Sequence, residues 1–157
     1  MSQEDLLKHK TIMLVDDDKD ILATLTRGLQ QSGFKVHGFS DPIAALAHVE
    51  AGCKDCELGV SDIRMPRMNG FQLVRKIREV RRDMKIIFMT AFEINKTEFD
   101  KIFPSIEIGG IIHKPFLASR LAEMITEVYR DKSNIQPRSD NPSTPVIADS
   151  RPDSAKT

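Results

Sequence analysis

Apolar and polar residues alternate along the chain in two patterns. Short apolar runs, typical of strands buried inside a parallel sheet, are followed by longer segments whose apolar residues recur every three or four positions, as in amphipathic helices. We predict strands at Ile12–Val15, Lys35–Phe39, Leu58–Asp62, Ile86–Met89 and Ile111–Ile112. Helical repeats begin near Ile21, Pro42, Phe71 and Leu117.

Strands that alternate with helices predict an α/β fold. Successive strand and helix units pack best as a five-stranded, parallel, doubly wound sheet with right-handed crossovers. Asp41 and Pro42 support one helix start, because aspartate is a good N-cap and proline suits the first helical position. We expect this domain to cover residues 11–131, after an N-terminal extension of residues 1–10.

Residues 132–157 have a different composition. They combine Pro137, Pro142, Pro145 and Pro152 with many polar residues and no aromatic residue. Such a segment cannot bury enough apolar surface to offset the entropy of ordering, so we predict a disordered C-terminal tail.

Composition narrows the function classes. The 157 residues carry a formal net charge of +0 with 40% hydrophobic residues, which fits one soluble domain. The balanced charge gives no field that favours nucleic acid or an anionic membrane. Since neither a signal peptide nor a membrane-spanning stretch is recognisable, we expect a cytoplasmic protein. We interpret the basic run at Arg75, Lys76, Arg78, Arg81, Arg82 and Lys85 as a solvated helix face.

Polar residues stand where the predicted strands end. Asp16 and Asp17, Asp62, Thr90 and Lys114 should meet at one edge, because the carboxyl ends of parallel strands lie together. Clustered carboxylates repel one another unless a cation binds, and an oxygen-only set suits Mg²⁺. A lysine charge and a threonine hydroxyl beside them would stabilise a phosphoryl group in transfer.

These residues lie in four motifs that, together with Gly70, resemble the motifs of response-regulator receiver domains in type, order and spacing. The match covers Thr11 to Arg130 and rests on Val15-Asp16-Asp17, Ser61-Asp62-Ile63-Arg64-Met65-Pro66, Gly70, Met89-Thr90-Ala91 and Lys114-Pro115-Phe116. The resemblance implies a flavodoxin-like (βα)5 fold. It also implies a stand-alone, single-domain response regulator.

The resemblance assigns roles to the polar residues. Asp62 would be the phosphoacceptor for a histidine kinase's phosphohistidine. Asp17, Asp62 and the backbone carbonyl of Arg64 would ligate Mg²⁺, with Asp16 acting mainly through a bound water. Thr90 and Lys114 would contact the phosphoryl oxygens, and the Lys114–Pro115 peptide bond would be cis.

The implied partners are a histidine kinase or phosphotransfer protein and a downstream protein that the sequence does not name. Signalling would proceed by phosphorylation-dependent protein contact or by phosphorelay. The chain would not be an enzyme beyond Mg²⁺-dependent self-phosphorylation and self-dephosphorylation. The alternative is a receiver-like interaction module that works without phosphorylation, against which the complete set of site residues argues.

Other chemistries fit these residues less well. An EF-hand loop starting at Asp16 would need glycine at Ile21 and glutamate at Arg27. A phosphatase of the haloacid dehalogenase type would need threonine at Asp20 and a cap domain. A dinucleotide fold would need a GxGxxG turn after the first strand.

Several positions depart from the family pattern or stand apart from it. Ile111 occupies the place of the usual aromatic switch residue, and Pro104 interrupts the segment 93–108 where the fourth helix would lie. Arg64 and Phe92 would flank the path of the hydrolytic water, which predicts slow loss of phosphate.

Cys53 and Cys56 form an isolated CxxC, and the histidines show no ligand spacing, so we expect no metal or redox role there.

Overall fold

The strand and helix pattern folds as predicted. The computed structural model describes residues 7, 9–92, 97, 101 and 108–130. Its elements are β1 (Thr11–Val15), α2 (Lys19–Gln31), β2 (Lys35–Phe39), α3 (Pro42–Glu50), β3 (Cys56–Asp62), α4 (Gly70–Val80), β4 (Lys85–Thr90), β5 (Gly110–His113) and α6 (Ala118–Arg130). The strands form one sheet in the order β2-β1-β3-β4-β5, with every pair parallel. The predicted doubly wound α/β fold is therefore confirmed.

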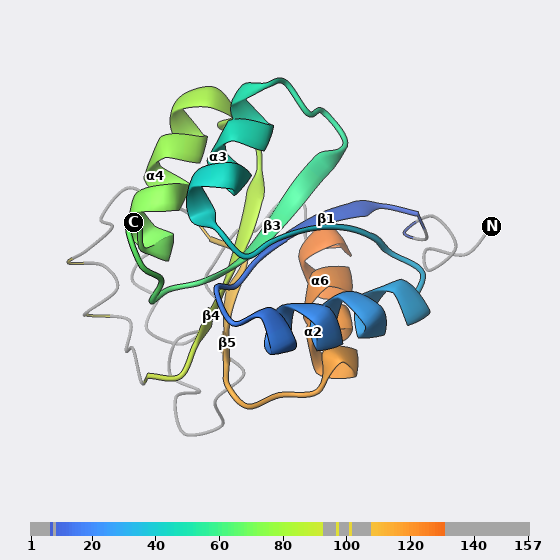
Figure 1. Ribbon diagram of the computed structural model, residues 1–157. Helices are drawn as coiled ribbons and strands as arrows, with labels where there is room; N and C mark the ends of the chain where they lie inside the picture. Colours follow the sequence, from blue (N-terminus) through green and yellow to red (C-terminus); the bar gives the residue numbers. More distant parts are fainter. Residues whose placement is uncertain (1–6, 8, 93–96, 98–100, 102–107, 131–157) are drawn as a thin grey trace.

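Helices cover both faces of this sheet. In Figure 1, α3 and α4 lie on one side, and α2 and α6 lie on the other. Successive residues of β1 point to opposite faces of the sheet. Met13 and Val15 belong to one buried cluster, whereas Ile12 and Leu14 belong to the other. Because side chains of a strand alternate between faces, a fully apolar strand builds two cores at once.

Side-chain caps fix where the helices begin. The Asp41 carboxylate accepts a hydrogen bond from the N–H of Ile43 at 2.9 Å, with Pro42 in the first turn, as the sequence predicted. Asn69 and Gln72 form a reciprocal capping box that starts α4 at Gly70, one residue before the predicted start. These caps hold the loops that follow β2 and β3 in defined positions.

Some predictions concern residues outside the described ranges. They are most of the N-terminal extension 1–10, the tail 132–157, and most of the segment 93–108 with Pro104 and the implied fourth helix. Among the described residues, no helix combines the length and apolar character needed to cross a membrane.

Candidate functional site

The carboxyl ends of four strands bring the predicted site residues together. Asp16 follows β1, Asp62 and Thr90 end β3 and β4, and Lys114 follows β5. One carboxylate oxygen from each of Asp16, Asp17 and Asp62 lies within 4.8 Å of the others. We call these three residues the acidic cluster. The sheet topology thus brings to one edge residues that are separated by up to about a hundred positions in the sequence.

Lys114 joins two members of the acidic cluster. Its Nζ donates to Oδ2 of Asp16 at 2.9 Å and to Oδ2 of Asp62 at 3.2 Å. Asp16 is fully buried, and its Oδ1 accepts from the N–H of Asp18 at 2.9 Å. Burial alone would lower the pKa of Lys114, but the hydrogen bond to Asp16 and the charge of Asp62 outweigh it and raise that pKa. Lys114 is therefore held as an ammonium between the two carboxylates.

Asp62 has a pKa raised above its ordinary value. Burial is the largest cause, and the Asp16 charge adds to it, while Lys114 and the backbone N–H of Ile63, at 2.9 Å from Oδ1, pull the pKa down. The sequence predicted mutual repulsion of the carboxylates, which contributes here but is second to burial as a raising cause. The result is a carboxylate that gains from a nearby cation.

Thr90 and the β5–α6 connection complete this edge. The Thr90 hydroxyl oxygen accepts from the N–H of Phe92 at 2.9 Å, which leaves the hydroxyl hydrogen available as a donor. The Thr90 carbonyl accepts from the N–H of Lys114 at 2.7 Å. The Lys114–Pro115 peptide bond is cis, as the resemblance implied.

Gly70 allows the loop after β3 to close on the site. A Cβ atom at this position would lie 2.3 Å from the carbonyl oxygen of Asp62 and 3.0 Å from Cα of Ile63. The N–H of Gly70 donates to the Ile63 carbonyl at 2.7 Å. Only glycine permits this approach, because the neighbouring atoms belong to the backbone and cannot move aside cheaply.

The same loop contacts α3. Arg67 has a positive φ of 71°, an uncommon backbone conformation for a residue with a side chain. Its guanidinium forms an ion pair with Asp41, the N-cap of α3. The loop that follows Asp62 is thereby connected to the start of α3.

Ile111 is packed into the core. It is 2% exposed and belongs to the buried cluster that contains Phe88 and Ile108. The place of the usual aromatic switch is thus filled by a buried, stiff, β-branched side chain.

The acidic cluster has the donor set that Mg²⁺ prefers. Its ligands are carboxylate oxygens alone, with Asp17 exposed to solvent and the other two buried. Three carboxylates and the Lys114 ammonium leave a formal charge of about −2, which a divalent ion would balance. The backbone carbonyl of Arg64 remains a predicted fourth protein ligand.

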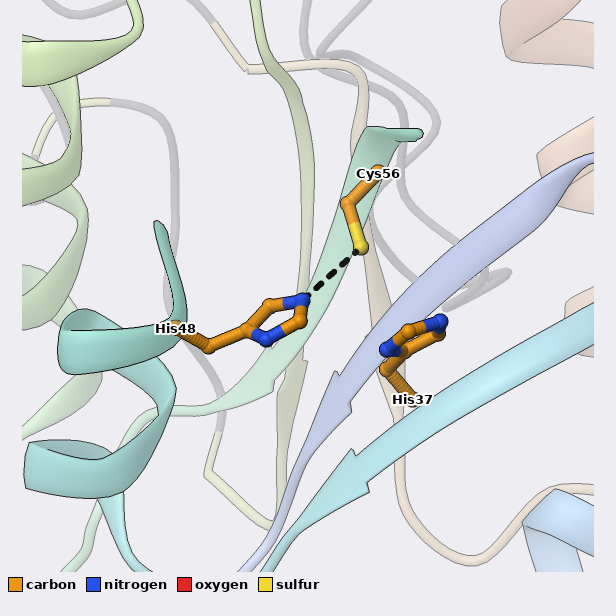
Figure 2. Close-up of side chains that lie close together, drawn as sticks. All are labelled: His37, His48 and Cys56. Atoms are coloured by element: carbon orange, nitrogen blue, oxygen red, sulfur yellow. Dashed lines mark hydrogen bonds between the residues drawn. The ribbon is translucent and has the colours of Figure 1, made fainter. Parts of the chain in front are cut away.

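A second cluster, not anticipated from the sequence, lies elsewhere on the sheet. His37, His48 and Cys56 each place one ligand atom within 4.8 Å of the others (Figure 2). We call them the thiol–imidazole cluster. Burial lowers the pKa of His48, with the His37 charge adding to the effect, and burial raises the pKa of Cys56 to about 12. Only the strand register, which the chain spacing does not reveal, could have indicated this grouping.

Comparison with known proteins identifies a family whose motifs include the residues of the acidic cluster. The family model described as "Response regulator receiver domain" matches residues 12–126. The chain belongs to this family. Among curated relatives, the receiver domain is 31% identical over 124 residues to the sensor kinase CckA of Brucella abortus, which covers 79% of this chain and 13% of CckA.

Other relatives are similar over nearly their whole length. The response regulator receiver protein CpdR of Brucella abortus is 29% identical, with 77% of this chain and 95% of CpdR covered. The crystal structure of a CheY-like receiver domain protein from Methanospirillum hungatei is 27% identical, with a TM-score of 0.68 and coverage of 78% and 96%. By contrast, the chain spans only 24% of the transcriptional regulator DctD of Rhizobium meliloti. These relatives support a response-regulator role for this receiver domain.

Proposed function

We propose that this receiver domain accepts a phosphoryl group on Asp62 in a Mg²⁺-dependent reaction and then signals through protein contact or onward phosphoryl transfer. One observation carries the proposal. Nζ of Lys114 lies within 3.2 Å of both Asp16 and Asp62, at the strand edge where ligands bind in open α/β sheets. The site residues are therefore assembled for a group that carries several anionic oxygens.

The reaction is a displacement at phosphorus. A carboxylate oxygen of Asp62 forms the new bond to phosphorus, and the bond between phosphorus and the donor's imidazole nitrogen breaks, with the electron pair leaving on the imidazole. The product is an acyl phosphate on Asp62. No further covalent chemistry is required of the protein, so its contribution is positioning and charge stabilisation.

The remaining residues act on the phosphoryl oxygens. Lys114 can transfer its one hydrogen bond from Asp62 to a phosphoryl oxygen without leaving Asp16, because Nζ has three donors. The Thr90 hydroxyl can donate to a second oxygen while still accepting from Phe92. Mg²⁺ held by Asp17, Asp62 and the Arg64 carbonyl, with Asp16 behind a water, would supply charge neutralisation for this transfer.

The proposed partners follow from this chemistry and from the relatives. Phosphoryl transfer to an aspartate needs a donor of higher transfer potential, which a histidine kinase or phosphotransfer protein provides. The similarity to a sensor kinase and to a response regulator receiver protein supports such a partner. We place the reaction in the cytoplasm, with an unnamed protein as the downstream target.

Labelling of Asp62 tests the proposal. The protein, incubated with acetyl phosphate and Mg²⁺, should form a phosphoprotein that phosphate-affinity electrophoresis and intact mass detect. The Asp62→Asn variant should remain unlabelled, because an amide is too weak a nucleophile. Asp83→Asn, at an exposed aspartate that pairs with Arg81, is the matched control and should label normally.

Two outcomes would contradict the proposal. Undiminished labelling of Asp62→Asn would place the acceptor elsewhere. An unlabelled wild-type protein, with both acetyl phosphate and a histidine kinase as donors, would favour the interaction module that works without phosphorylation.

A further inference from the structure

The thiol–imidazole cluster joins three elements of the fold. His37 comes from β2, His48 from the last turn of α3, and Cys56 is the first residue of β3. In Figure 2 the imidazole of His48 points to the sulfur of Cys56, and His37 lies beside both. Sγ of Cys56 is 3.7 Å from Nε2 of His48. Three side chains that can each bind a metal therefore converge from different parts of the chain.

Cys53 supplies a fourth donor. Its Sγ lies 3.6 Å from Sγ of Cys56, and both thiols are free. The Cys53 carbonyl accepts from a guanidinium nitrogen of Arg81 at 3.0 Å, which holds the turn between α3 and β3. Cys53 does not belong to the group of ligand atoms that all lie within 4.8 Å of one another, so its thiol borders the thiol–imidazole cluster through Cys56.

The spacing of these atoms suits a tetrahedral ion. Bond lengths of about 2.3 Å to sulfur and about 2.0 Å to nitrogen place neighbouring tetrahedral ligands roughly 3.3–3.8 Å apart. The 3.6 Å and 3.7 Å separations fall in this range. The His37 ring centroid is 4.9 Å from that of His48, and the rings are tilted by 42°, so they are not stacked flat against each other. The ligand atom of His37 lies within 4.8 Å of those of His48 and Cys56, so His37 would move toward them when one ion binds all three.

A purely structural role explains less of this arrangement. Cys56 is completely buried and packs in the core, and a thiol in contact with one imidazole would satisfy it. That role requires neither a second imidazole nor a second thiol at this distance. His37, His48 and Cys53 are only partly buried, which provides a route for an ion from solvent.

We propose that His37, His48 and Cys56 bind a transition-metal ion of the zinc class, with the adjacent thiol of Cys53 turning toward the ion as the fourth ligand. Two sulfurs and two imidazole nitrogens select borderline and soft ions, whereas the oxygen-only acidic cluster selects Mg²⁺. Each thiol releases its proton to solvent as its sulfur binds the ion. The ion would cross-link β2, α3 and β3 through His37, His48 and Cys56.

This site is separate from the phosphoacceptor. Cys56 begins β3 and Asp62 ends it, so the two residues stand about 20 Å apart at roughly 3.3 Å per residue. The proposal is therefore independent of the proposed phosphorylation of Asp62. Failure of one leaves the other intact.

Metal titration of the full chain tests the site. Reduced protein, stripped with a chelator, is titrated with Co²⁺ and then with Zn²⁺ against a chromophoric chelator. With excess Mg²⁺ present to occupy the acidic cluster, we expect one Co²⁺ per chain that shows thiolate-to-cobalt charge transfer and the intense visible bands of tetrahedral coordination, both lost when Zn²⁺ displaces it. Melting temperature should rise with Zn²⁺, because the ion binds only the folded chain.

Variants separate the four-ligand site from weaker binding. Cys56→Ser and His48→Gln should each lower Zn²⁺ affinity at least about 100-fold and remove the tetrahedral bands. His9→Asn, at an exposed histidine outside the cluster, should bind Zn²⁺ as the wild type does. Circular dichroism checks that each variant is folded.

Three results would overturn the proposal. The first is reduced wild-type protein that gives no thiolate–cobalt band. The second is a His37→Gln, His48→Gln double variant with wild-type Zn²⁺ affinity, which would mean that the CxxC binds alone. The third is one ion per two chains, which would mean that the ion bridges copies of the protein.

Discussion

The guanidinium of Arg64 stacks on the ring of Phe92, with Cζ of Arg64 4.1 Å from the ring centroid. Arg64 stands two residues after Asp62, and Phe92 two residues after Thr90. The cation–π contact joins the loops after β3 and β4 across the acidic edge. The family resemblance implies that both side chains flank the path of the hydrolytic water to Asp62.

This contact predicts slow loss of phosphate. Hydrolysis of an aspartyl phosphate needs a water in line with phosphorus, and a contact between the two side chains that flank this path would hinder that water. The Arg64→Asn, Phe92→Ala double variant should release phosphate faster, by on the order of tenfold, equivalent to about 1.4 kcal/mol in the barrier. Release of inorganic phosphate from purified phosphoprotein measures the rate. Equal rates for variant and wild type would reject the shielding.

Asp17 is expected to set Mg²⁺ affinity. Asp17→Ala removes an exposed carboxylate whose oxygen lies within 4.8 Å of those of Asp16 and Asp62. Affinity should fall by roughly tenfold or more, and labelling by acetyl phosphate should slow at subsaturating Mg²⁺. Calorimetric titration gives the affinity, and Asp20→Ala, in the first turn of α2, is the control. An unchanged Mg²⁺ affinity would make Asp17 a solvated loop residue.

Lys114 is expected to stabilise the folded chain in the absence of metal. Lys114→Met leaves the completely buried carboxylate of Asp16 without its cation, at a cost of about 3 kcal/mol. Urea unfolding in a chelator measures the loss, and adding Mg²⁺ should raise the variant's melting temperature more than that of the wild type. Lys10→Met breaks the exposed pair with Glu57 and should cost at most about 1 kcal/mol. Similar losses for the two variants would contradict the buried-pair argument.

Gly70 is expected to be intolerant of even one methyl group. Gly70→Ala places Cβ against the backbone of Asp62 and Ile63, so the free energy of unfolding should fall by about 1–3 kcal/mol. Gly59→Ala is the control: its Cβ would meet only the ends of Met13, Met84 and Ile86 at 3.4–3.5 Å. Denaturant unfolding compares them, and an equal, small effect at both positions would show that the loop adapts.

The fold was predictable because its signals are local and repeated. Apolar runs such as Ile12–Val15, followed by helical periodicity, indicate buried parallel strands whatever the tertiary contacts. Proline after an N-cap located α3 to the residue. The α4 start was missed by one residue because its cap depends on a side-chain exchange between Asn69 and Gln72.

The acidic cluster was predictable for a topological reason. Every residue at the end of a parallel strand reaches the same edge, so Asp16, Asp62 and Lys114 could be grouped without knowing distances. The thiol–imidazole cluster had no such signal. His37 lies within β2 and His48 within α3, so their meeting with Cys56 depends on register and helix rotation, which one sequence does not specify.

Helix α3 lies between the thiol–imidazole cluster and the loop that follows Asp62: its N-cap Asp41 pairs with Arg67 of that loop, and its last turn carries His48. If α3 couples the two sites energetically, thermodynamic linkage makes the coupling reciprocal. If an ion bound at His48 changes the equilibrium constant for phosphorylation of Asp62 by some factor, phosphorylation must change the affinity for that ion by the same factor. A receiver with both sites would respond to a metal ion and to phosphorylation, and α3 would couple the two responses.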